Sequence, residues 1–411
     1  MSAWWFWLVR FSRRLLVRAS LYGLFGVAAA LAAVWFAPLV PEEMSERLGG
    51  EAVEGILTAL ASSLLAVTTF SLSAMVVAYT AASAQMTPRA ASYVTSDRAT
   101  QGALATFVGA FLFTIVALVA LGANYYGAQG RTILFLATLI MVGLVAVRLI
   151  AWIDRVARLA QHGHILSQIE DSARSALRAR RARPHLGGTP LEAPRQGVEV
   201  AARKSGYIAN IDPEKLQHAA EKMNADIDVL VLPGESVVRG GPLAIVVGAG
   251  PSDDDYEKMC DAFAISPART IEQDPLYAMQ ILTEVAGRAL SPGINDPGTA
   301  VLVADCAYRV LEEWVSEADD QEDACEFDRL RARDLDGGAL IAQSLGEIGR
   351  YGAGDVTVAT RVQQALTALA AHCDGALAQG ARAQTAIALK RAEAALAFEP
   401  DVERVRAAAL R

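Results

Sequence analysis

The chain has 411 residues, and its hydrophobic content of 53% exceeds that of an ordinary soluble domain. Residues 1–205 carry a net charge of +8 and the remainder carries −16, which indicates a membrane part followed by a soluble part. The acidic second half argues against nucleic acid as a partner.

The first predicted element is an interfacial segment, residues 1–19. Its sequence begins MSAWWFWLVRFSRRLLVR, where the four aromatic side chains of WWFW lie close to four arginines. This combination is typical of a helix that lies among the lipid headgroups. Regulated lipid sensing is the alternative, and we favour a simple membrane anchor.

Four apolar stretches are long enough to cross a bilayer, and they predict a transmembrane domain over residues 20–152. The stretches are 20–40, 56–80, 103–122 and 132–152. Arginines lie before the first stretch, between the second and third, and after the fourth, whereas the loop between the first two is acidic. By the positive-inside rule we expect a multi-pass protein of the bacterial inner membrane with both termini in the cytoplasm.

The second predicted span carries hydroxyl side chains along one narrow face of its helix. They are Thr58, Ser62, Thr69, Ser73 and Thr80. Two interpretations stay open: a close helix–helix seam of small polar residues, or the wall of a water-filled pore. No charged residue lies deep within a predicted span, which disfavours proton-coupled transport but not a passive pore.

A pore within the four helices of one chain is narrow. A channel therefore requires a ring of subunits that each contribute the second span. On this interpretation the chain is a homo-oligomer in the lipid bilayer, and its further partners are inorganic ions.

The fourth span is predicted to continue into a cytosolic stalk helix and linker, residues 153–197. A basic cluster near the end of the stalk predicts contact with anionic lipid. The cluster consists of Arg178, Arg180, Arg181 and Arg183. His162 and His164 lie two residues apart and face different sides of a helix, and the four cysteines form no CxxC pair. We therefore expect free thiols and no metal site.

Residues 198–250 change to Val-rich runs broken by Pro-Gly and Gly-Gly, which predict a small β-rich module. Their order resembles half of a biotinyl- or lipoyl-type module, which carries its prosthetic group on a lysine at a hairpin tip. The matching turn here has no lysine, and Lys222 lies in a helical context. No cofactor is therefore expected.

Residues 251–411 are predicted to form a helical cytosolic domain, interrupted by ALSPGINDPGTA at 289–300. Pro and Gly end one helix there, and Asp296 fits the N-cap of the next. Capping alone explains neither Ser291 nor Asn295. Three flanking charged residues complete a group that forms either a structural network or a ligand site, and we favour the network. These three are Arg269, Asp274 and Arg288.

The predicted fold is thus an α-helical membrane protein with four transmembrane helices and a cytosolic α+β region, a small β module followed by helices. No catalytic constellation is recognisable, because Ser291 has neither a GxSxG setting nor a nearby histidine. An enzyme is therefore not expected.

Two stretches resemble a known family: FSLSAMVVAYTAASAQMTPR at 70–89 and DPLYAMQILTEVAGRALSPGINDPGTA at 274–300. The segments SGYIANID and PGESVVRGGPL fit the same family, a bacterial membrane-protein family called domain of unknown function twenty-two fifty-four. The resemblance covers nearly the whole chain. It implies a multi-span inner-membrane protein with a cytosolic C-terminal region, and no settled activity.

Two classes of function remain. The first is a homo-oligomeric channel in which the second span lines the path and the cytosolic domain assembles or gates it. The second is a membrane-anchored ligand-sensing or scaffolding protein that does not conduct.

Overall fold

The computed structural model describes residues 15–32, 52–96, 98–159, 162–316, 325–373 and 375–409. These residues divide into two compact units. The span unit lies within Leu8–Ala84 and Ala91–Ile165. The sheet unit comprises Leu166–Arg411 together with the short stretch Gln85–Ala90.

The span unit is helical. Its helices are α2 (Leu15–Ala32), α4 (Ala52–Gln85), α6 (Arg98–Gly122) and α7 (Ala128–Leu159), and α5 (Pro88–Ser96) runs from the sheet unit into it. Three stretches are long and apolar enough to cross a membrane: Val53–Ala84, Thr100–Gly122 and Ala128–Arg155. They contain the predicted spans 56–80, 103–122 and 132–152.

The prediction of four spans is confirmed for three of them. The first predicted span, 20–40, contains the apolar helical stretch Ser20–Ala32, which is shorter than a membrane crossing requires. Residues 33–40 lie outside the described residues, as do residues 1–14 of the predicted interfacial segment.

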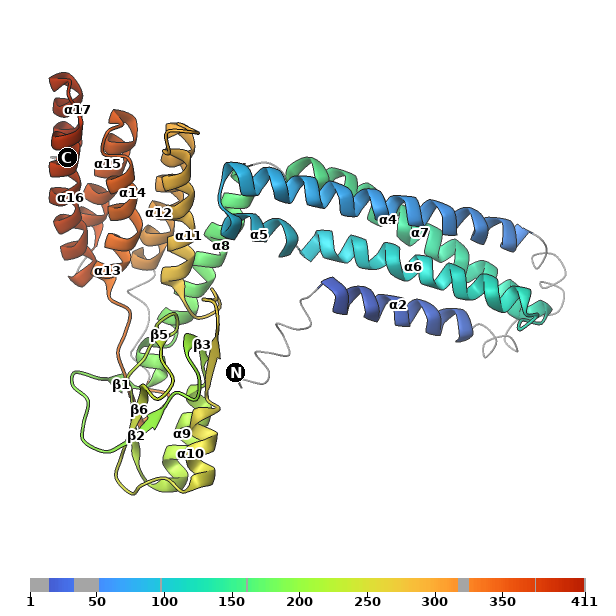
Figure 1. Ribbon diagram of the computed structural model, residues 1–411, viewed down its shortest axis with the longest axis horizontal. Helices are drawn as coiled ribbons and strands as arrows, with labels where there is room; N and C mark the ends of the chain where they lie inside the picture. The colour runs from blue at the N-terminus through green and yellow to red at the C-terminus, as the bar shows by residue number, and fades with distance from the viewer. Residues whose placement is uncertain are drawn as a thin grey trace. The chain divides into compact units, whose positions relative to one another are not determined.

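Helices α2 and α6 pack backbone to backbone, side by side in Figure 1. A Cβ on Gly26 would lie 2.5 Å from the carbonyl oxygen of Gly109, and one on Gly109 would lie 2.8 Å from that of Tyr22. The hydroxyl of buried Tyr126 donates a 2.7 Å hydrogen bond to the Ala30 carbonyl and holds the end of α2 against the loop after α6. Small residues thus set the helix contact, as is usual in membranes.

The sheet unit contains two sheets. The first has the strand order β1-β8-β4-β6-β2 and the second β5-β3-β7. The strands are β1 (Thr189–Pro190), β2 (Val198–Ala201), β3 (Gly206–Ile211), β4 (Asp226–Val229), β5 (Ser236–Val237), β6 (Pro242–Val247), β7 (Phe263–Ser266) and β8 (Leu330–Ala332). Strand β8 pairs in parallel with both β1 and β4, and the other pairs are antiparallel.

The β region therefore does not keep to the predicted module 198–250. Strands β7 and β8 lie in the stretch that was predicted to be helical, and β1 precedes the module. The two sheets share one apolar core, to which Val200, Ile227 and Leu330 contribute from distant parts of the chain. A strand can pair with any strand edge that lies beside it in the fold. Strands far apart in the sequence can therefore belong to one sheet.

Helices make up the rest of the sheet unit. They are α8 (His162–Arg181), α9 (Pro213–Met223), α10 (Asp253–Cys260), α11 (Pro275–Ala289), α12 (Pro297–Ser316), α13 (Gly337–Ile341), the π-helical turn η4 (Ala342–Gly346), α14 (Glu347–Tyr351), α15 (Val356–His372), α16 (Gly375–Ala395) and α17 (Glu399–Ala409). Helices α15, α16 and α17 pack against one another. The turn η2 (Pro184–Gly187) joins α8 to β1.

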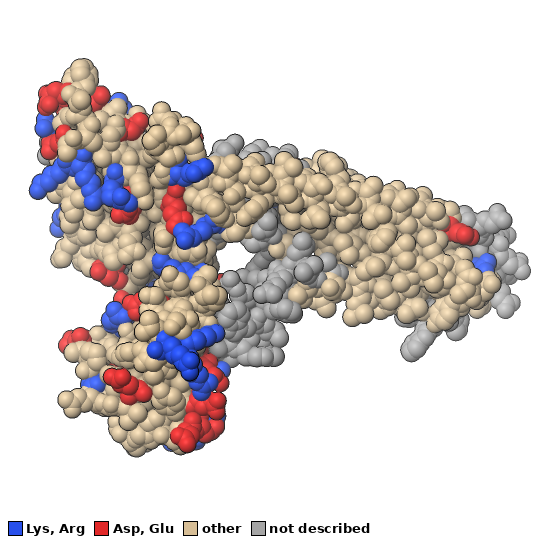
Figure 2. All heavy atoms as spheres, viewed as in Figure 1, with Lys and Arg blue, Asp and Glu red and all other residues tan. Residues whose placement is uncertain are grey.

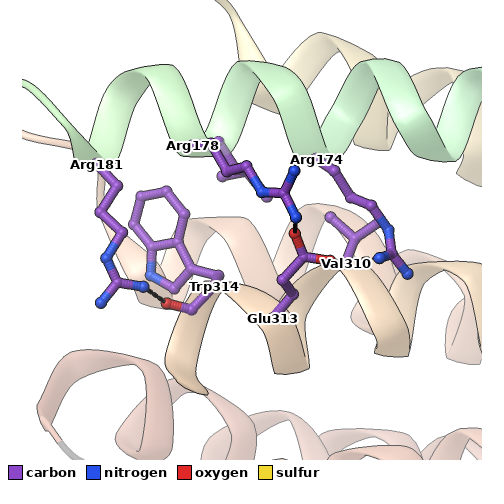
Figure 3. A pocket seen from close by; sticks show the side chains of 7 residues that line it. Arg174, Arg178, Arg181, Val310, Glu313 and Trp314 are labelled. Atoms are coloured by element: carbon purple, nitrogen blue, oxygen red, sulfur yellow. Dashed lines mark hydrogen bonds and ion pairs between the residues drawn. The ribbon is translucent and has the colours of Figure 1, made fainter. Parts of the chain in front are cut away.

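Helix α8 belongs to the folded sheet unit from Leu166 onward, and this part is not a solvated stalk. Its apolar side, with Ile169 and Leu177, is buried. The arginines predicted to meet lipid form pairs within the unit: Arg178 with Glu313, Arg180 with Asp334, Arg181 with the Trp314 carbonyl, and Arg183 with Glu326. Figure 3 shows two of these pairs between α8 and α12. Three of the four arginines are thus paired with carboxylates, and Arg181 donates to a neutral carbonyl.

Candidate functional site

The hydroxyl face of α4, which we define as Thr58, Ser62, Thr69, Ser73 and Thr80, is exposed in the chain. The opposite side of the helix, with Leu57, Leu64 and Met75, is buried. The stripe therefore makes no seam with the described helices of its own chain. In a membrane this face meets lipid, water or another protein.

Most of these hydroxyl groups donate to the backbone of the preceding turn. Distances from hydroxyl oxygen to carbonyl oxygen are 3.1 Å for Ser62, 2.9 Å for Thr69, 3.0 Å for Ser73 and 2.8 Å for Thr80. A hydroxyl that has donated its proton still offers lone pairs as an acceptor. The face thus presents oxygen atoms, which suit a cation or water.

Helix α4 carries a single charged residue, Glu54, in its first turn. On the side drawn in Figure 2, the helices of the span unit are almost wholly uncharged, whereas the sheet unit carries both acidic and basic side chains. An uncharged surface with one polar stripe is compatible with a bilayer on most sides of α4.

The N-terminal end of α11 holds a buried ion pair. Asp274 is 1% exposed and caps the helix, accepting a 3.1 Å hydrogen bond from the Tyr277 amide. Arg269 donates to both oxygens of Asp274, at 2.8 and 2.9 Å, and its guanidinium lies 5.0 Å from the centre of the Tyr277 ring. Burial raises the pKa of Asp274, and Arg269 opposes this rise.

Gly234 covers this ion pair. Its φ of +92° lies in the left-handed region, and a Cβ there would be 2.1 Å from Oδ2 of Asp274. Only glycine fits, both for its backbone angle and for the space. The tight turn predicted at Pro233-Gly234 therefore seals the carboxylate from solvent.

A chain of hydrogen bonds runs from this pair along α11. Arg269 donates to Gln280 at 2.7 Å, Gln280 donates to Glu284 at 3.0 Å, and Glu284 pairs with Arg89. We call Arg89, Glu284, Gln280, Arg269 and Asp274 the polar relay. It joins the two stretches of the family resemblance, because Arg89 ends the first and the other four lie in or beside the second. Arg89, Gln280 and Glu284 were not predicted; the i, i+4 spacing of Gln280 and Glu284 was the available signal.

The residues after the C-terminal end of α11 serve to end this helix. The Ser291 hydroxyl donates to the Arg288 carbonyl at 2.6 Å, and the Asn295 amide donates to the Ser291 carbonyl at 2.9 Å. Asn295 has a φ of +51°, a conformation that asparagine tolerates better than most residues. These observations account for the two residues that capping alone left unexplained.

Asp296 begins α12 as an N-cap. Its Oδ1 accepts a 3.0 Å hydrogen bond from the Thr299 amide, and its Oδ2 accepts one of 2.6 Å from the Thr299 hydroxyl. The predicted group is therefore divided. Arg269 and Asp274 lie at one end of α11, and Ser291, Asn295, Asp296 and exposed Arg288 lie at the other, about 22 Å away at 1.5 Å per residue.

Replacing Asp296 with alanine is expected to lower the free energy of unfolding by about 1 kcal/mol, since the Thr299 amide loses its acceptor. Asp296→Asn keeps an acceptor, and it should lower the free energy of unfolding by only a few tenths of the loss expected for alanine. Thermal unfolding of the full chain in detergent compares the two. A charge-dependent ligand role would instead appear as lost function in the Asn variant with an unchanged melting temperature.

The fold defines a class: a membrane protein whose spanning helices are joined to a mixed sheet-and-helix unit. Within the residues that the structure describes, no group of three or more His, Cys, Asp or Glu is placed to hold a metal ion. The family model "Predicted membrane protein (DUF2254)" matches residues 12–368, and the chain belongs to this family.

Curated relatives are uncharacterized proteins of Mycobacterium bovis and Mycobacterium tuberculosis. Each is 28% identical to the chain over 238 residues, which cover 54% of this chain and 44% of the relative. The match thus spans less than half the length of these relatives. No solved structure matches the chain.

Proposed function

We propose that the chain forms a homo-oligomeric channel in the bacterial inner membrane, with α4 lining the path and the sheet unit in the cytoplasm together with both termini. The observation that carries the proposal is the hydroxyl face of α4, exposed on the side away from the buried face of the helix. The positive-inside pattern of the loops supports the orientation.

The polar stripe favours a ring of copies over a single chain in lipid. Hydrocarbon offers no partner to the acceptor lone pairs of Thr69 and Ser73, whereas water in a pore does. In a ring, each copy turns this face inward and packs its other exposed surfaces on neighbours or lipid. Neutral oxygens along the path can then replace part of the hydration shell of an ion.

The polar relay supports a gating role for the sheet unit. Arg89 follows the end of α4 by four residues and pairs with Glu284 of α11. A displacement of α11 is therefore transmitted by an ion pair to the segment that ends the proposed pore helix. Networks of hydrogen bonds and ion pairs are one of the routes by which coupling between distant sites is carried.

A second candidate is a membrane-anchored ligand sensor without conduction. A cavity of about 320 Å³ at the end of α8, lined in part by buried Arg180, favours it. The two candidates differ in one measurable property, the passage of ions.

The decisive experiment compares two neighbouring threonines in purified protein reconstituted into vesicles. Thr69 is exposed on the hydroxyl face, whereas Thr68 is partly buried and donates to the Leu64 carbonyl at 2.6 Å. Thr69→Val should create an apolar constriction that dewets, and we expect ion flux to fall by about tenfold or more. Thr68→Val makes the same chemical change at the same depth and should leave the flux near that of the wild type.

Ser73→Asp extends the test, because a ring of carboxylates in the path should favour cations over anions. Oligomeric state is measured in parallel by crosslinking, so that disassembly is not mistaken for closure. A wild-type protein that passes no ions under any voltage, pH or tension rejects the channel. Equal effects of Thr68→Val and Thr69→Val reject the hydroxyl face as its wall.

A further inference from the structure

The cavity at the C-terminal end of α8 is enclosed by several separate parts of the sheet unit. Its volume is about 320 Å³, which lies at the lower end of the range for small-molecule pockets. The last turns of α8, the turn η2, the start of α9 and residues before β5 and α11 all contribute. The apolar part of the lining consists of Ala176, Ala179, Ala182, Leu186, Pro213 and Pro233.

The charged residues of the lining are both arginines. Arg180 is 8% exposed, and its guanidinium is fixed by Asp334 at 2.9 Å through Nε and by the Arg333 carbonyl at 3.0 Å through Nη2. Among the described residues no acceptor contacts its Nη1. Arg183 is held by Glu326 and lies 5.8 Å from the centre of the Phe327 ring.

The remaining polar residue of the lining is committed to the backbone. The side chain of Gln273 accepts from the Ile211 amide at 2.9 Å and donates to the Ile211 carbonyl at 3.2 Å. Asp334 and Glu326, which hold the arginines, do not line the cavity, nor does Glu214, whose Oε1 lies 3.8 Å from Nη1 of Arg183. An incoming molecule therefore meets an apolar wall and two oriented guanidinium groups.

The wall that carries Leu186 has an uncommon backbone. His185, Leu186 and Gly187 have φ values of +53°, +61° and +85°, and leucine rarely adopts a left-handed conformation. The surrounding fold holds this turn in place, since Leu186 belongs to the buried core and Nδ1 of His185 lies 2.9 Å from the Ala332 carbonyl oxygen. Such strain is retained mainly at functional positions.

We propose that this cavity binds a small carboxylate with a compact apolar body, such as a single aromatic ring or a short branched chain. The apolar part packs on the alanines and prolines. The carboxylate accepts hydrogen bonds from Nη1 of Arg180 and from Arg183, a charge-assisted contact that a neutral isostere does not reproduce.

The position of the cavity lets a bound ligand influence the membrane part through α8. This step rests on the proposed channel. Helix α8 begins at His162, shortly after α7, which contains the last candidate span. A ligand that joins the end of α8 to α9 and η2 restrains α8. Binding itself does not depend on conduction and is measured separately.

The probe is phenylacetate, with its neutral amide, phenylacetamide, as the matched control. Binding to the full-length protein in nanodiscs is followed by saturation-transfer NMR and calorimetry, with empty nanodiscs as the blank. Phenylacetate should bind at least about tenfold more tightly than the amide, because the neutral amide loses the charge-assisted part of its contacts with both arginines.

Two variants on α8 localise the site. Ala179 is exposed and lines the cavity, so Ala179→Leu fills the cavity and should weaken phenylacetate binding about tenfold or more. Ser175→Leu lies one turn earlier on the same helix, outside the lining, and should bind like the wild type. Both positions are exposed, so both variants should melt like the wild type.

Three results overturn the proposal: phenylacetate that does not bind wild-type protein above the blank, phenylacetamide that binds as tightly, or an Ala179→Leu variant that binds unchanged. Ion flux measured with and without phenylacetate then tests the link to conduction. Binding without any flux in wild-type protein rejects the channel and leaves the ligand site intact.

Discussion

Gly109→Ala should loosen the packing of α2 on α6 and lower the free energy of unfolding by about 3 kcal/mol. The added methyl group would lie 2.8 Å from the Tyr22 carbonyl oxygen and 2.9 Å from its carbon, and neither backbone atom can rotate away. The two helices must therefore separate, and the packing around Gly26 is lost with them. Thermal unfolding of the full chain in detergent measures the change.

Gly143→Ala in α7 is the matched control. Nothing lies within 4 Å of the Cβ position there, and alanine is the better helix former. This variant should keep or slightly raise the melting temperature. Equal melting temperatures for Gly109→Ala and wild type would show that α2 does not pack on α6 at this point.

Acidification should remove the stability that Glu170 contributes between α8 and α12. Its side chain is 9% exposed and accepts hydrogen bonds from Arg309 at 2.6 Å and 2.9 Å and from Arg174 at 2.7 Å. Burial alone would raise the pKa of Glu170, but hydrogen bonds from Arg309, Cys306 and Arg174 outweigh it and lower the pKa to about 2.

A carboxyl group whose pKa is lower in the folded than in the unfolded chain stabilises the folded protein. This contribution is complete at pH values above the pKa that the group has in the unfolded chain. The contribution of Glu170 is therefore complete above 4.5, its ordinary pKa, and is lost as the pH falls toward about 2. The shift corresponds to about 3 kcal/mol. Because Arg309 is half exposed and water screens the pair, we expect a loss of about 2 kcal/mol.

Glu170→Gln should remove this pH dependence and destabilise the protein at neutral pH by a similar amount. Asp171→Asn, at the exposed neighbouring position, removes the same charge without breaking a described contact and should behave as wild type. Unfolding of the three proteins is compared at pH values from neutral to acidic. A Glu170→Gln variant that keeps the acid sensitivity of the wild type would assign that sensitivity to another group.

Local patterns in the sequence predicted the local features of the fold. Long apolar stretches predicted three spans, and Asp296 followed by Pro297 predicted the start of α12. Pro233-Gly234 predicted a turn, and the structure has one there. Each of these features depends on a short stretch of consecutive residues. It can therefore be recognised without knowing which distant residues contact it.

Features made by distant residues were missed. Strand β8 has three residues and becomes a strand only because β1 and β4 lie on either side of it. The lipid contact of the basic cluster stays a prediction, but the sequence did not show that Glu313, Asp334 and Glu326 pair with three of its arginines. Two of the five residues of the polar relay were predicted: Arg269 and Asp274 lie five residues apart, whereas Arg89 lies 195 residues from Glu284.

The order of the strands has a consequence for synthesis on the ribosome. Strand β4 lies between β8 and β6 in the sheet, yet β8 leaves the ribosome about 100 residues later. At usual elongation rates this delay lasts about 5 to 20 s. During that time one edge of β4 has no partner strand, while the spanning helices have already been made. A nascent chain in this interval offers an open edge to neighbouring copies, so chaperone protection matters most there, and slower synthesis prolongs the exposure.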